Sequence, residues 1–137
     1  MCMSQTVVRH FRSRPQFQAL LQRHPVATTR HFALHHLPLP AAGSGPAAGP
    51  HTLFCGHDGL WLDAMVPKRW ARRAVRRNLI RRQIHAVGAQ ALAHSSDAWL
   101  LRLRAAWDKT DYPSASSVAL KRAVRTELLE LLARQTP

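Results

Sequence analysis

Residues 66–94 read VPKRWARRAVRRNLIRRQIHAVGAQALAH and carry the densest charge in the protein. Eight of the 20 lysines and arginines fall within residues 68–82, and no acidic residue accompanies them. Cations spaced this closely repel one another unless a polyanion neutralises them, and arginine favours bidentate contacts to phosphate. A solvated charged helix face is the alternative, but such a face normally mixes both signs. The stretch therefore predicts an anion-binding surface.

From Ala74 onward, this stretch has the pattern of an amphipathic helix. At about 100° per residue, one side collects Ile80, Ile84, Val87 and Ala91, which we expect to pack. The opposite side is polar, and its neutral member Asn78 suits hydrogen bonds to a sugar hydroxyl, a phosphate oxygen or a base edge. The predicted nucleic-acid-binding residues are Lys68, Arg69, Arg72, Arg73, Arg76, Arg77, Asn78, Arg81, Arg82 and His85.

Length and composition favour one domain, spanning residues 1–137, with a polyanionic partner. The net charge of +13 favours nucleic acid first and an anionic membrane surface second. No apolar run approaches the ~18 residues of a membrane span. Cys2 and Cys55 lack metal-ligand spacing, so a reduced, cytoplasmic location is the expectation. The acid-free, arginine-bearing N-terminus leaves a mitochondrial transit peptide as an alternative.

Hydrophobic periodicity along the chain predicts an α+β fold with one sheet covered by helices. Ser13 is a candidate cap for a short helix over residues 16–23. One or two strands are expected at 26–37, with others at 60–66 and 98–105, and a closing helix at 116–133. The intervening segment 38–50, with four prolines and three glycines, predicts an exposed connection. Residues 51–55 could add a strand, and 108–113 a turn.

Three closely spaced histidines, His31, His35 and His36, raise the possibility of a metal site. They lie in a predicted strand with no carboxylate nearby, so we predict no metal site and favour an RNA-facing role for them. No motif for nucleophilic, acid–base or metal catalysis occurs in the sequence, so no catalytic residue is predicted.

The four tryptophans lie among basic stretches and could stack on bases. Core positions are the more common role for Trp61 and Trp99 in strands of this kind, and Trp70, in the basic loop, is expected to be exposed.

These motifs resemble the protein subunit of bacterial ribonuclease P. A strand ending in VPKR at 66–69 precedes ARRAVRRNLIRRQIHA at 71–86, similar to the family's strand and Arg-Asn-x-x-Lys/Arg-Arg helix. The residues that match this helix motif are Arg77, Asn78, Arg81 and Arg82. Leu79 and His85 stand where the family usually has basic residues. A weaker similarity extends over about residues 15–132, with 38–59 as an insertion and 1–12 as a flexible N-terminus.

The resemblance implies a single-domain α/β sandwich of the ribosomal protein S5 domain 2-like type. Its order would be αβββαβα, with a left-handed βαβ crossover over residues 60–104. The protein would join a catalytic RNA that holds Mg²⁺ and removes the 5′ leader from precursor tRNA, and would be inactive alone. Phe17, Leu21 and His35 would line a leader-binding cleft between the first helix and the sheet.

Two other classes of function stay open on the sequence. One is a non-catalytic RNA-binding or ribosome-associated protein on the same fold. The other is a basic helix that binds DNA or a membrane surface, which Gly88 and the flanking strands disfavour. We therefore expect neither a membrane nor a DNA partner.

Overall fold

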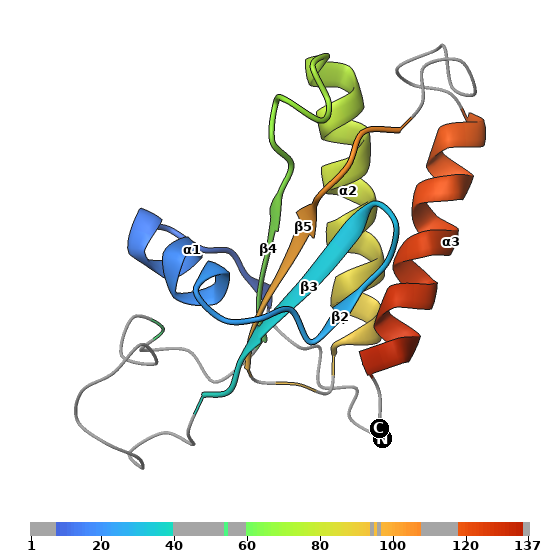
Figure 1. Cartoon of the computed structure of the whole chain (residues 1–137). Helices are drawn as coiled ribbons and strands as arrows, with labels where there is room; N and C mark the ends of the chain where they lie inside the picture. The colour runs from blue at the N-terminus through green and yellow to red at the C-terminus, as the bar shows by residue number, and fades with distance from the viewer. Residues whose placement is uncertain are drawn as a thin grey trace.

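A computed structural model describes residues 8–39, 54, 60–93, 95, 97–107 and 118–135. Its elements are β1 (Val8–Arg9), α1 (Arg14–Leu21), β2 (Ala27–Thr28), β3 (Phe32–Leu37), β4 (Leu60–Met65), α2 (Ala74–Ala91), β5 (Ala98–Leu103) and α3 (Val118–Gln135). The strands form one sheet in the order β1-β4-β5-β3-β2. Figure 1 shows α2 and α3 side by side on one face of this sheet, with α1 apart from them. The fold is the predicted α+β sandwich.

The strands alternate between two apolar clusters because successive side chains point to opposite faces. In β4, Leu62 and Ala64 join the cluster under α2 and α3, whereas Trp61 joins the cluster under α1. In β5, Trp99 joins the cluster under α2 and α3, and Leu100 joins the cluster under α1. Both clusters therefore depend on the central strands, and the expected burial of Trp61 and Trp99 is confirmed.

The connection from β4 through α2 to β5 joins parallel neighbouring strands. In Figure 1 these strands point upward, α2 lies behind the sheet, and β5 lies to the right of β4. This arrangement makes the crossover left-handed, against the usual rule. The helix approaches β4 closely at Gly88, where an added Cβ would lie 2.9 Å from Leu62 Cδ2.

Two details differ from the sequence prediction. Val8 and Arg9 form a strand parallel to β4, and Phe11 is buried, so residues 8–12 do not form a flexible end. A strand of two residues has no periodicity to detect. Ala91 is exposed, because α2 ends there and Leu92 fills the buried position. Residues 1–7, most of 38–59, 108–113 and the start of the closing helix lie outside the described residues.

Candidate RNA interface

Asn78, Arg81 and Arg82 are exposed on α2 and form a surface that we call the arginine face. The opposite side of the helix carries Ile80 and Ile84, which are fully buried. No acidic residue lies in the first turn of α2. Among the described ion pairs, none joins a carboxylate to Arg81 or Arg82. The arginine face therefore presents uncompensated positive charge to solvent.

Arg77, which was expected on the same surface, is half-buried and contacts the loop before the helix. Its Nη1 donates hydrogen bonds to the carbonyl oxygens of Ala71 (2.9 Å) and Arg72 (2.7 Å). A guanidinium group that satisfies two carbonyls holds the loop in place. The structure thus gives Arg77 a positioning role beside any phosphate contact of its remaining donors.

Arg76 was among the predicted nucleic-acid-binding residues, but its side chain is buried, with 7% of its surface exposed. Burial lowers the pKa of this guanidinium, and the nearby charge of Arg73 lowers it further. A buried side chain on the packed side of the helix does not present its charge to a ligand in solvent.

The basic loop, residues 67–73, leads from β4 into α2 and exposes Lys68, Arg69, Arg72 and Arg73. The Arg69 guanidinium lies 5.2 Å from the centre of the Trp70 ring, within the range of a cation–π contact. Trp70 is half-buried against the core rather than exposed, and its indole Nε1 is buried without a hydrogen-bond partner in the described structure. The sequence expectation of an exposed stacking platform at Trp70 is therefore wrong.

An apolar cleft of about 590 Å³ lies next to the arginine face. It is lined by the segment from Phe11 to Arg14, by Phe17 of α1, by the end of β4 from Ala64 to Pro67, and by Arg81. The Phe11 and Phe17 rings meet edge to face, with centroids 5.0 Å apart. The cleft therefore brings an aromatic wall, formed by Phe11 and Phe17, next to the cationic side chain of Arg81 on α2.

Two further residues that were predicted to line a cleft are absent from its wall. Leu21 is half-buried against the cluster under α1. His35 is 2% exposed; its Nδ1 lies 3.1 Å from the Arg23 carbonyl oxygen, and its Nε2 accepts a hydrogen bond from Arg102. Burial lowers the pKa of His35, and so does Arg102, although the bond to Arg23 opposes them. His35 thus packs under α1 and does not reach the cleft.

The two neighbouring histidines each pair with an acidic residue, which disfavours their expected RNA-facing role. His31 is buried, pairs with Glu127 at 2.7 Å and stacks on Trp107. His36 pairs with Asp97 at 2.8 Å and stacks on Trp99. Each imidazole has its own acidic partner, and the two do not converge on a common site.

Three basic or polar residues at the cleft were not among the predicted site residues. Arg12, Ser13 and Arg14 line it and are exposed. The start of α1 is held by Gln16, whose side chain accepts hydrogen bonds from the backbone N–H groups of Arg12 and Ser13. The acid-free composition of the N-terminal region was the available signal, but it did not single out these positions.

His85 lies one turn beyond Arg81 and is half-buried. Its Nε2 is 3.8 Å from Asp63 Oδ1, and its ring meets that of His10 edge-on. Burial and the nearby His10 and Arg81 lower the pKa of His85, whereas Asp63 raises it. Protonation of this imidazole is therefore less favourable than that of a free histidine side chain.

Comparison with known proteins agrees with this geometry. Residues 7–128 match the family model described as Ribonuclease P. The chain is 33% identical over 118 residues to the ribonuclease P protein component of Ralstonia pickettii (strain 12J), covering 85% of this chain and 71% of that protein. The fold is similar to that of the Staphylococcus aureus ribonuclease P protein, with a TM-score of 0.59 and 17% identity over 90% of this chain and 92% of that one. None of the helices among the described residues could span a membrane. The chain therefore belongs to the ribonuclease P protein family.

Proposed function

We propose that this protein binds the catalytic RNA of ribonuclease P through the arginine face and basic loop, and holds the 5′ leader of precursor tRNA in the adjoining cleft. The observation that carries this proposal is the position of Arg81, which belongs to the arginine face and also lines the cleft beside Phe17. Cationic side chains bind the phosphate backbone whatever the nucleotide sequence, and an aromatic ring stacks on an unpaired base. The two surfaces together suit an RNA that passes from a structured part into a single strand.

The chemistry is assigned to the RNA, because the described acidic residues are engaged elsewhere. Asp63 accepts two backbone N–H bonds, Asp97 and Glu127 pair with histidines, and Glu130 pairs with Arg134. These contacts leave no pair of carboxylates arranged for acid–base work within the described residues.

Magnesium is the ion that the family resemblance implies, and the residues that the structure describes do not fit it. Mg²⁺ prefers an octahedron of oxygen ligands. The one cluster of three potential ligands among the described residues contains two histidines and a single carboxylate. We therefore assign Mg²⁺ to the RNA subunit. The protein orients the RNA and neutralises part of its negative charge. We place this activity in the cytoplasm.

Purification of the full chain from its host, followed by sequencing of the bound RNA, tests the proposal. We expect one dominant structured RNA that carries out 5′ cleavage of precursor tRNA. Ribosomal RNA in its place would favour the alternative of a ribosome-associated protein. Recovery of no RNA at low salt would exclude both RNA-binding functions.

Replacing Phe17 by alanine should weaken binding of precursor tRNA to the assembled holoenzyme by about 1–3 kcal/mol, the usual contribution of one base–aromatic stack. Binding of mature tRNA, which has no leader, should not change. Equilibrium binding of the two tRNAs to the reconstituted holoenzyme measures the difference.

Leu21→Ala is the matched control, because Leu21 lies one turn along the same helix and outside the cleft. It should leave the preference for precursor over mature tRNA unchanged. Equal weakening of both tRNAs by Phe17→Ala would rule out a leader-specific cleft.

A further inference from the structure

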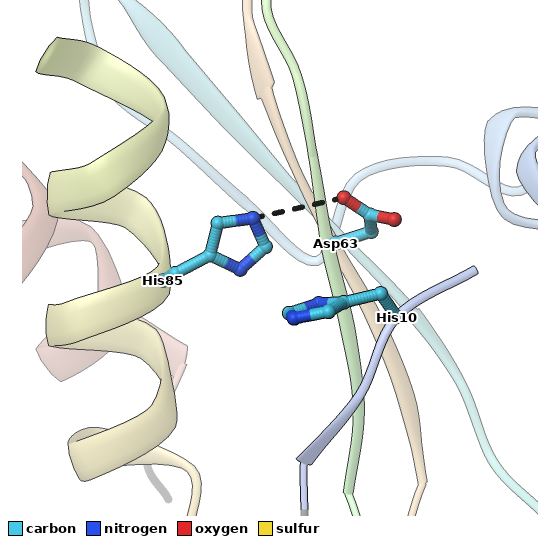
Figure 2. Close-up of side chains that lie close together, drawn as sticks. All are labelled: His10, Asp63 and His85. Carbon is cyan, nitrogen blue, oxygen red and sulfur yellow. Dashed lines mark ion pairs between the residues drawn. The ribbon is translucent and has the colours of Figure 1, made fainter. Parts of the chain in front are cut away.

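His10, Asp63 and His85 converge from three separate elements. His10 follows β1, Asp63 lies on β4, and His85 lies on α2. Each offers one potential metal-ligand atom, and these atoms all lie within 4.8 Å of one another. Figure 2 shows the three side chains pointing toward a common space between the sheet edge and the helix. Two imidazoles and a carboxylate are ligands that zinc and related transition metals prefer.

The backbone already holds two of these side chains in the orientation that a metal site requires. His10 Nδ1 lies 3.1 Å from the Leu62 carbonyl oxygen, so this nitrogen carries the proton and the lone pair is on Nε2. Asp63 Oδ2 accepts a bond from Phe11 N–H at 3.0 Å, and Oδ1 accepts one from Ala64 N–H at 2.7 Å. A carboxylate oxygen with one such bond keeps a second lone pair. These contacts correspond to the outer hydrogen bonds that orient ligands around bound metals.

The third side chain, His85, lies close to Asp63 but does not form an ordinary hydrogen bond with it. His85 Nε2 is 3.8 Å from Asp63 Oδ1, beyond the normal range for a hydrogen bond. Bonds of about 2.0–2.2 Å from a tetrahedral ion would place two ligand atoms about 3.3–3.6 Å apart. Small side-chain rotations would therefore bring this pair to metal-binding distance. His85 Nδ1 is buried and has no hydrogen-bond partner in the described structure.

We propose that His10, Asp63 and His85 bind one divalent transition metal ion of the zinc class, with a fourth coordination position open to solvent. His10 is exposed, so the open position can take water or a phosphate oxygen. The proposal departs from the sequence prediction, which named no metal ligand. It adds to the proposed RNA-binding function and does not depend on it.

The proposed metal site lies next to a residue that lines the cleft, so metal binding should affect the cleft wall. An ion held there ties the segment after β1 to both β4 and α2. The next residue, Phe11, bonds Asp63 through its backbone and lines the cleft with its side chain. Metal binding should therefore stabilise the wall that faces Phe17, because a ligand that binds only the folded state raises its stability.

The test is titration of the metal-free full chain, without RNA, with Zn²⁺ by calorimetry and with Co²⁺ by visible absorption. Wild-type protein should bind one equivalent and show the d–d bands of a low-coordinate Co²⁺ site. His10→Gln and His85→Gln should each lower affinity at least about tenfold, since loss of even an outer-shell partner costs that much. His24→Gln, which changes an exposed histidine outside the cluster, is the matched control and should bind like wild type.

Thermal unfolding supplies a second measurement, in which zinc binding is detected as a rise in melting temperature and not by titration. Zn²⁺ should raise the melting temperature of wild type and His24→Gln by the same amount, and that of His10→Gln by clearly less at the same zinc concentration. The proposal is overturned if wild type binds no more tightly than the double variant His10→Gln/His85→Gln. It is also overturned if excess Mg²⁺ displaces the bound ion, because the site would then lack transition-metal selectivity.

Discussion

Replacing Arg81 and Arg82 together by alanine is expected to weaken binding to the catalytic RNA and to flatten its salt dependence by about 1.4–1.8 units. Each phosphate contact contributes about 0.7–0.9 to the slope of log affinity against log salt concentration. Both side chains are exposed and have no described acidic partner, so their charge is available to phosphate. Binding of the purified RNA over a series of salt concentrations measures the slope.

The matched control is Arg122→Ala/Arg125→Ala, which removes two exposed arginines from α3. The control should change the slope much less, because these residues lie on another helix and away from the cleft. Asn78→Ala should lower affinity without changing the slope, since it removes hydrogen bonds and no charge. An unchanged slope in the folded Arg81/Arg82 variant would place the RNA surface elsewhere.

The purified protein, free of RNA, is expected to cleave no precursor tRNA at any magnesium concentration. Adding the catalytic RNA should produce cleavage at the 5′ end of the mature tRNA. Phosphodiester hydrolysis needs an activated water and stabilisation of developing charge, often supplied by metal ions. The described carboxylates are already paired or bonded to backbone, while the arginine face contributes positive charge. Cleavage assays with each component alone and with both together measure this dependence.

The RNA alone should need more magnesium than the complex, because ions must replace the cations of the arginine face. In a complex assembled with the Arg81→Ala/Arg82→Ala variant, the magnesium concentration needed for cleavage should rise toward that needed by the RNA alone. Nuclease-controlled cleavage by the protein alone, abolished by Asp97→Asn or Glu127→Gln, would contradict the assignment of the chemistry to the RNA.

Local sequence patterns predicted the central elements well. The alternation in residues 60–66 and 98–105 matches the two faces of β4 and β5, because a central strand must send apolar side chains to both sides. The helical period after Ala74 likewise placed Ile80 and Ile84 in the core and Arg81 and Arg82 on the surface. These signals lie within single elements, where sequence neighbours are also neighbours in space.

The site was predicted only in part. The arginine face followed from the helix period, but the burial of Arg76 and the tether of Arg77 to the loop depended on how α2 meets the preceding turn. The leader cleft was expected between the first helix and the sheet, and no arginine was named among its residues. Arg81 instead lines the same cleft as Phe17, because the crossover places α2 beside the segment that leads into α1.

The order of the main elements, the apolar faces that form the core and the basic stretch that matches the family could all be predicted from the sequence alone. The three-dimensional packing was needed to show which histidines are buried, which arginines are exposed, and which residues that are distant in the sequence are in contact. His10, Asp63 and His85 have no common motif and come together because β1 pairs with β4 and α2 packs beside that edge. Contacts of this kind arise from sheet pairing and helix packing, and a period read along one segment carries no information about them.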